Sequence, residues 1–158
     1  MRHIKLTRGL FAMVDDEDYE MLSHYKWMAC KKGSGFYAAR NSEIGGRHTT
    51  IRMHRQILLP DPDKEVDHIN GDQLDNRRCN LRPCTRTQNR HNTRSAAGST
   101  SKFVGVYWDS QRKAWRARVT VDGKRVHVGL FQDETEAAKA RDIAATEAYG
   151  EWAWLNFR

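Results

Sequence analysis

A short stretch of small, uncharged residues divides the chain and limits what it can fold into. It reads Ser-Ala-Ala-Gly-Ser-Thr-Ser over residues 95–101, a composition typical of a linker. Each part of the 158 residues must therefore bury a core of its own. We predict a β-rich region, a second unit, a linker and a third unit, in residues 1–50, 51–95, 96–101 and 102–158.

Positive charge is concentrated in the middle of the chain. Residues 76–132 carry 13 Lys/Arg and 2 Asp/Glu, whereas residues 1–75 carry 11 and 12. Such a block predicts binding to a polyanion, and arginine suits bidentate contacts to phosphate or guanine. A solvated surface balanced by acids elsewhere is the alternative. The expected contacts in this block are Arg77, Arg78, Arg82, Arg86, Arg90 and Arg94.

Several classes of protein are disfavoured. Three cysteines are too few for a disulfide scaffold, and Cys79 and Cys84 lack a second Cys/His pair for structural zinc. No apolar run approaches eighteen residues, and the N-terminus lacks a secretory pattern. We therefore expect a cytoplasmic protein, in a bacterial cell or phage-infected host, without a membrane partner.

Elements of the N-terminal half follow from local patterns. We predict a strand over 9–14, a hairpin of strands 36–40 and 48–53 turning at Gly45-Gly46, and a short helix beginning near His54. The acidic run 15–20 is expected to cap and charge the start of a helix, with a metal site as the alternative.

Polar residues cluster in the centre of the chain. Asp67-His68 is followed by Asn80 twelve residues after His68, and Asn89 lies nine residues further on. Asn70-Gly71 permits a tight turn, and Thr85 with Gln88 has the form of a capping box that starts a helix. This predicts a strand–loop–strand–helix unit on which the polar residues converge.

This stretch, VDHINGDQLDNRRCNLR, resembles the His-Asn-His (HNH) nucleases. The resemblance implies a ββα-metal fold that cuts DNA with one divalent cation. It implies that His68 is the general base, that Asn80 orients the His68 imidazole and that Asp67 binds the metal. A neutral imidazole can take a proton at pH 7, which agrees with this chemistry.

The third metal ligand comes from the helix in this resemblance. Asn89 and His91 point about 200° apart on a helix, so they cannot both face one metal. We favour Asn89 as the ligand and His91 as a phosphate contact. Asp and Asn oxygens suit Mg²⁺ or Mn²⁺ better than zinc. His54 either supports the site or simply packs.

Residues 102–158 predict three strands (105–108, 114–121, 124–131) and a helix over 133–149 that Gly150 stops. They resemble the AP2 DNA-binding domain through Phe103–Val106, Trp115–Val119, Val128–Phe131 and Leu155-Asn156-Phe157. The resemblance implies a three-stranded antiparallel sheet backed by one helix, with the open face in the major groove. The expected DNA contacts of that face are Tyr107, Arg116, Arg118, Thr120, Arg125 and His127.

The whole chain is therefore expected to be an α+β, homing-type endonuclease that acts on double-stranded DNA as a monomer. A single metal site predicts nicking of one strand per engagement. Two alternatives stay open. One is a DNA-binding regulator with a degenerate nuclease unit, and the other is a nuclease that acts on RNA.

Overall fold

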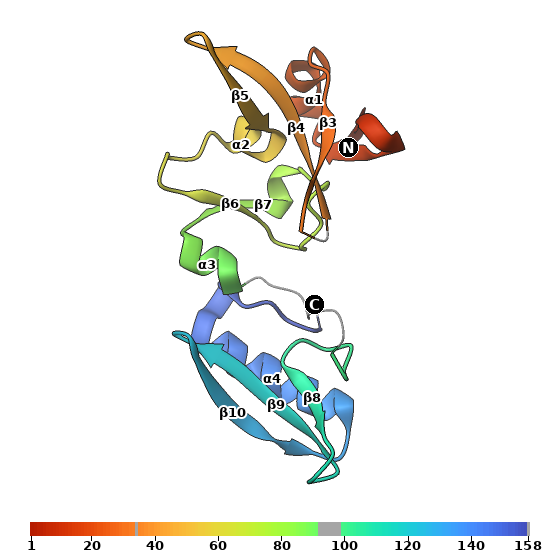
Figure 1. Ribbon diagram of the computed structural model, residues 1–158, viewed down its shortest axis with the longest axis vertical. Helices are drawn as coiled ribbons and strands as arrows, with labels where there is room; N and C mark the ends of the chain where they lie inside the picture. Colours follow the sequence, from red (N-terminus) through yellow and green to blue (C-terminus); the bar gives the residue numbers. More distant parts are fainter. Residues whose placement is uncertain (34, 92–98, 158) are drawn as a thin grey trace. The chain divides into compact units, whose positions relative to one another are not determined.

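The computed structural model describes residues 1–33, 35–91 and 99–157, with the backbone alone at residues 90 and 91 (Figure 1). The chain divides into two compact units, Met1–Asn89 and Arg90–Arg158. Both mix helices with small antiparallel sheets. Among the described residues, no helix has the length and apolar character needed to cross a membrane.

The described residues of the N-terminal unit form three small sheets. In one sheet β1 pairs with β2, in another the order is β3-β4-β5, and in the last β6 pairs with β7. The strands are β1 (Arg2–Lys5), β2 (Phe11–Val14), β3 (Met28–Lys32), β4 (Gly35–Ile44), β5 (Arg47–Arg52), β6 (Glu65–His68) and β7 (Leu81–Cys84). The helices are α1 (Asp16–Ser23), α2 (Met53–Leu58) and α3 (Arg86–His91).

The hairpin of β4 and β5 turns where the sequence predicts. Ile44 pairs with Arg47, so the connection has two residues, Gly45 and Gly46, with φ of 57° and 73°. Positive φ at both positions suits glycine and matches the twist of the flanking strands. The prediction of this turn is confirmed, and β4 is longer than expected because its pairing with β5 continues from Ala39 to Ile44.

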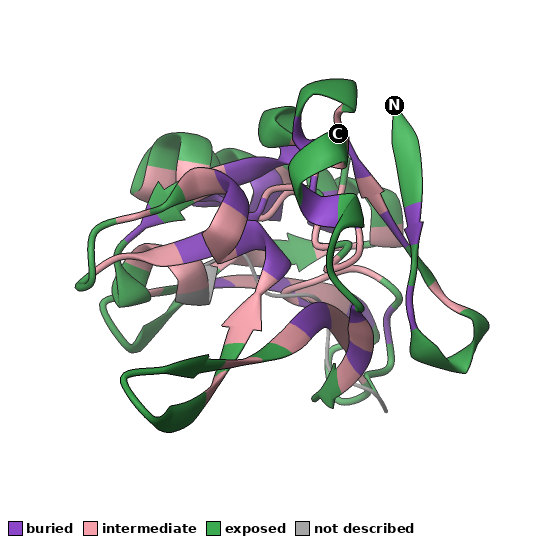
Figure 2. Cartoon of the chain, turned by 90° about the horizontal axis from the view of Figure 1, so that it is seen from above, coloured by how far each residue is buried: buried purple, intermediate pink, exposed green. Residues whose placement is uncertain are grey.

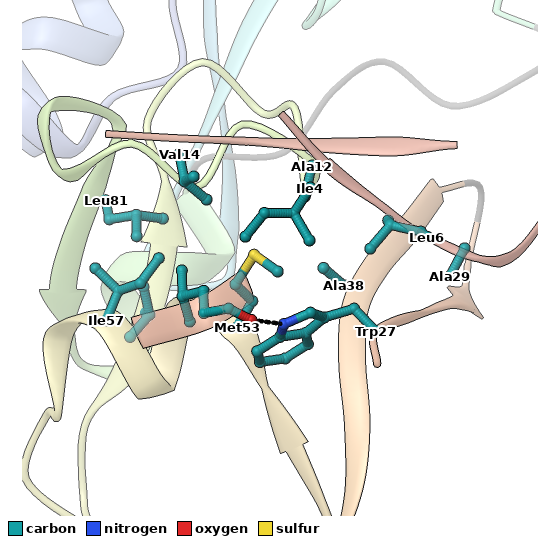
Figure 3. Packing of buried hydrophobic residues seen from close by; sticks show 12 residues of the cluster. Ile4, Leu6, Ala12, Val14, Trp27, Ala29, Ala38, Met53, Ile57 and Leu81 are labelled. Atoms are coloured by element: carbon teal, nitrogen blue, oxygen red, sulfur yellow. Dashed lines mark hydrogen bonds between the residues drawn. The ribbon is translucent and has the colours of Figure 1, made fainter. Parts of the chain in front are cut away.

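One core serves the whole N-terminal unit. Met53 is fully buried among Ile4, Ala38 and Trp27, and the Trp27 indole donates to the Leu22 carbonyl at 2.8 Å (Figure 3). The same cluster continues through α2 to β6 and β7. The boundary predicted at residue 50 therefore falls inside a single core, because the strands before it and the helix after it bury their apolar side chains together.

The acidic run at α1 does not cap the helix with its side chains. Asp15 occupies the N-cap position, but its carboxylate accepts from the backbone N–H of Arg78 at 2.7 Å. Buried Asp18 accepts two hydrogen bonds from the Arg78 guanidinium. Glu17 forms an ion pair with the same guanidinium at 2.9 Å. The prediction that these side chains cap the helix was wrong, because they bind the backbone N–H and the guanidinium of the distant Arg78 instead.

The C-terminal unit has the sheet and helix that the sequence predicts. Strands β8 (Val106–Asp109), β9 (Ala114–Val121) and β10 (Lys124–Phe131) form an antiparallel sheet in the order β10-β9-β8. Helix α4 (Glu134–Tyr149) packs on one face, and its buried alanines permit close approach. Figure 2 shows buried and exposed bands alternating along strands and helices, as expected for elements covered on one side.

The linker prediction is only partly covered by the structure. Residues 96–98 lie outside the described residues. Ser101 is buried and donates to the Glu134 carboxylate at 2.7 Å, while its hydroxyl accepts from the N–H of Phe103. Ser101 therefore belongs to the packed C-terminal unit and not to a free linker.

Truncation of Met53 tests the shared N-terminal core. Met53→Ala removes a fully buried side chain, so we expect the unit to lose about 2–5 kcal/mol of unfolding free energy. Urea unfolding followed by circular dichroism measures this loss. Met21→Ala is the matched control, because Met21 is 41% exposed and its truncation should change stability by less than about 0.5 kcal/mol. Equal effects of the two variants would contradict the assignment of the core.

Candidate nuclease site

Three aromatic rings meet at the end of strand β6. His68 closes the strand, and its ring lies 5.0 Å from His54 of α2 and 5.9 Å from Tyr37 of β4, measured between centroids. His54 and Tyr37 are also in contact, at 5.5 Å. The rings meet edge to face, which restricts the orientation of the His68 imidazole. His54 thus packs against the predicted catalytic histidine.

Burial keeps both histidines neutral. Loss of solvation lowers the pKa of His68, partly opposed by its hydrogen bond to Asn76 and by nearby carboxylates. Loss of solvation and the neighbouring His68 lower the pKa of His54 to about 3. A neutral imidazole carries a lone pair that can accept a proton, so His68 is chemically suited to act as a base.

The contact with Asn76 bears on which ring nitrogen of His68 carries the proton. Asn76 Oδ1 lies 3.4 Å from His68 Nε2, and Asn76 Nδ2 donates to the Leu74 carbonyl, which fixes the amide orientation. An amide oxygen only accepts, so the proton of the neutral ring sits on Nε2 and the lone pair on Nδ1. Asn76 is fully buried and was not singled out from the sequence, where it appears as one polar residue among many.

Asn80 binds the loop that follows β6. Its Oδ1 accepts from the N–H of Asn70 at 2.9 Å, and its Nδ2 donates to the carbonyl of Asp75 at 2.8 Å. The sequence-based role of Asn80 was to orient the His68 ring. In the structure both polar atoms of the amide bind backbone groups, and Asn76 is the amide that contacts the ring. Asn80 therefore positions the loop that carries Asn76.

A buried carboxylate organises the same loop. Asp75 is 1% exposed, and it accepts from Arg77 at 2.6 and 2.7 Å and from the Asn70 amide at 2.9 Å. The Arg77 hydrogen bonds lower the pKa of Asp75, so it stays ionised. The N–H of Met13 in β2 donates to the Leu74 carbonyl, and the N–H of Asn76 donates to the Met13 carbonyl, so backbone hydrogen bonds join this loop to β2. The loop is therefore held both by the hydrogen bonds of Asp75 and by its backbone pairing with β2.

The predicted metal-binding residues lie on β6 and α3. Asp67 is buried and forms an ion pair with Arg82 at 2.8 Å. Asn89 donates through Nδ2 to Glu65 Oε2 at 2.5 Å, which fixes its amide and leaves Oδ1 as the oxygen for other contacts. Glu65 and Asp67 are two residues apart and share a face of β6. The capping box expected at this helix is confirmed, because Thr85 and Gln88 exchange hydrogen bonds at 2.8 and 3.2 Å.

The oxygen atoms of Asp67 and Asn89 suit a hard divalent cation better than zinc. The oxygens come from a carboxylate and an amide, ligands that Mg²⁺ and Mn²⁺ accept. In the described ranges, His, Cys, Asp and Glu do not gather in a group of three or more that could hold a metal. Glu65 was not predicted from the sequence, because its contact with Asn89 depends on how α3 packs beside β6.

Several arginines of the basic block are held by carboxylates. Arg77 pairs with Asp75, Arg78 with Asp18 and Arg82 with Asp67. The block therefore presents less unpaired positive charge than its residue count indicates. Arg86 is exposed at the start of α3. The side chains of Arg90 and His91, and all of Arg94, lie outside the described residues.

The predicted contacts of the C-terminal sheet share one face. Arg116, Arg118 and Thr120 alternate along β9, and cross-strand pairing places Tyr107 beside Arg116, His127 beside Arg118 and Arg125 beside Thr120. Intervening Ala117 and Val119 are buried under α4, so this face points away from the helix. The structure brings all six residues together on it.

Comparison with known proteins identifies the family. A family model described as HNH endonuclease matches residues 59–91. Over 156 residues, the chain is 30% identical to an uncharacterized HNH endonuclease of Acanthamoeba polyphaga mimivirus, covering 94% of this chain and 76% of that protein. The chain belongs to the HNH endonuclease family. It is therefore a nuclease, and the family's substrate is DNA.

Two further relatives match only part of this chain. Protein 3.8 of Escherichia phage T7 is 35% identical over 60 residues, 38% of this chain and 50% of its own length. An AP2-like ethylene-responsive transcription factor of Arabidopsis thaliana is 33% identical over 58 residues, 37% of this chain and 13% of its own length. The second match gives limited support to an AP2-like segment.

The buried His54 predicts that acid destabilises the endonuclease. Its pKa is about 3 in the folded state, against about 6.5 when exposed, so below pH 6.5 the unfolded chain takes up a proton that the folded chain does not. Unfolding free energy should fall by about 1.4 kcal/mol per pH unit near pH 5 from this group.

Urea unfolding between pH 7 and pH 4 measures this slope. His54→Asn should reduce it, whereas His24→Asn should not, because the His24 side chain is 69% exposed. An unchanged slope in His54→Asn would show that His54 does not stay neutral in the folded protein.

Proposed function

We propose that the chain is a metal-dependent endonuclease that hydrolyses one strand of duplex DNA at a time. In this proposal the N-terminal unit carries the chemistry and an AP2-like C-terminal unit binds the duplex. The observation that supports it most is the buried, neutral His68, caged by two rings and adjacent in sequence to Asp67.

His68 is proposed as the general base. Its Nδ1 takes a proton from a water molecule, whose oxygen attacks the phosphorus of the scissile phosphodiester. The bond from phosphorus to the leaving oxygen breaks, and that oxygen ends with a proton from solvent. Tyr37 and His54 pack against the ring, and Asn76 accepts the Nε2 proton, so the orientation of the Nδ1 lone pair is restricted.

Asp67 and Asn89 are proposed to hold one divalent cation, Mg²⁺ or Mn²⁺. Such a cation stabilises negative charge on the phosphate and on the leaving oxygen. Arg82 neutralises part of the Asp67 charge and fixes its carboxylate. Glu65 orients the Asn89 amide through its hydrogen bond to Nδ2.

The C-terminal unit is proposed to bind the major groove through the open face of its sheet. Arg118 and Arg125 supply positive charge there, and Tyr107 lies beneath the guanidinium of Arg118 at 4.7 Å. We also propose phosphate contacts from residues on either side of the boundary between the units, namely Arg86, Arg90, His91 and Arg94. The chain is proposed to act as a monomer.

Plasmid cleavage tests the general base. Supercoiled plasmid should relax to nicked circles with Mg²⁺ and remain intact with EDTA. His68→Ala should lose at least about 100-fold in cleavage rate while it retains DNA binding, because the proton acceptor is removed. His24→Ala, an exposed histidine, is the control and should cleave normally. Full activity of His68→Ala, or cleavage in EDTA, would contradict this mechanism.

The salt dependence of binding tests the sheet face. Arg118→Ala should weaken duplex binding and reduce the slope of log K against log salt by about one, since one phosphate contact is lost. Lys139→Ala removes the same charge from an exposed position of helix α4 and should leave the slope unchanged. Gel-shift titrations in EDTA from low to moderate salt measure both. Equal slopes for Arg118→Ala and the unmodified protein would argue against this face.

A further inference from the structure

Strand β10 contains a bulge that changes which side chains reach the open face. His127 pairs with Arg118, but Gly129, not Val128, pairs with Ala117. The register shift lies between His127 and Gly129, so Val128 is an extra residue in the strand. Strict alternation would place Leu130 on the same side as Val126 and Val128. The bulge moves Leu130 to the opposite face, because one extra residue reverses the alternation beyond it.

The contacts of its neighbours confirm where Leu130 points. Val128 and Phe131 pack against the cores beneath α4, and Gly129 pairs with fully buried Ala117. Leu130 pairs with Arg116 and is 41% exposed. Directly opposed residues of antiparallel strands share a face, so Leu130 belongs to the face of Arg116.

Leu130 lies in an ordered row of side chains on that face. Pairing across the sheet gives the row Tyr107, Arg116 and Leu130, one residue from each strand. Arg116 is fixed within the row, because it pairs with Asp109 and its guanidinium lies 5.7 Å from the Tyr107 ring centre. Leu130 therefore stands beside an arginine that is already held in place.

The surroundings of Leu130 decide its binding partner. The same face carries Arg118, Arg125 and His127, so it complements a polyanion and not an apolar protein surface. In the major groove of DNA, the 5-methyl group of thymine is the apolar group that a base pair presents to such a side chain. Duplex DNA therefore accounts for both the positive charge and the exposed leucine.

We propose that Leu130 contacts the 5-methyl group of a thymine in the major groove and so contributes to sequence specificity. This inference rests on the proposed binding of duplex DNA by the open face of the sheet. Burial of one methyl group against Leu130 should strengthen binding about fourfold, on the usual value for a buried methylene-sized group.

The experiment compares duplexes that differ only in that methyl group. The full chain is first used in EDTA to enrich bound sequences from a random-sequence duplex pool. The preferred duplex is then synthesised with thymine or with uracil, which lacks the 5-methyl group, one position at a time. Binding of both forms is measured for the unmodified protein, Leu130→Ala and Val126→Ala. Val126 is the matched control, because it lies on the same strand at 44% exposure and pairs with Val119, on the helix side.

The unmodified protein and Val126→Ala should bind the uracil form about fourfold more weakly at one position. Leu130→Ala should bind both forms equally. The same uracil penalty in Leu130→Ala, indifference of the unmodified protein at every thymine, or failure of the pool to enrich any sequence would overturn the proposal. Arg118→Ala separates this failure from the failure of the proposed function. If Arg118→Ala weakens binding while uracil has no effect, the face binds DNA without contacting the methyl group. If Arg118→Ala does not weaken binding, the face does not bind DNA.

Discussion

Buried carboxylates paired with arginine hold the N-terminal unit in the form that its site requires. Asp75 binds Arg77 and Asn70 inside the loop after β6, and Asp18 binds Arg78 from helix α1. The carboxylates are buried while the arginines reach the surface, so removal of an arginine leaves a buried negative charge without its partner. These ion pairs therefore link the loop after β6 to helix α1, next to strand β2. His68 depends on this arrangement through Asn76.

The sequence predicted those elements whose conformation is determined by residues close together in the chain. The glycine turn between β4 and β5, the capping box at α3 and the C-terminal sheet with its helix all lie where the residues indicate. Strands β1 and β3 were missed, because each has few buried residues and depends on pairing with a later strand. The bulge in β10 was missed for a related reason, since packing against α4 decides which residues turn inward.

The sequence also indicated much of the candidate site, and the structure adds contacts that the sequence did not reveal. His68, Asp67 and Asn89 were picked out by residue type and spacing, and these assignments stay predictions. Tyr37, Glu65 and Asn76 were not found, because their contacts with the site depend on the tertiary fold. Charge counting overestimated the free basic surface, since sequence alone does not reveal that acids of residues 15–18 and 75 lie against arginines 77 and 78.

The hydrogen bonds within the loop after β6 have a thermodynamic consequence. Asn70, Asp72 and Asn80 satisfy backbone groups of the loop internally, so its conformation is set when the chain folds. Fixing a backbone costs about 1–2 kcal/mol per residue in conformational entropy. That cost reduces the folding stability of the free protein and is absent from the association step. Association with another molecule therefore carries no further entropic cost of ordering this loop.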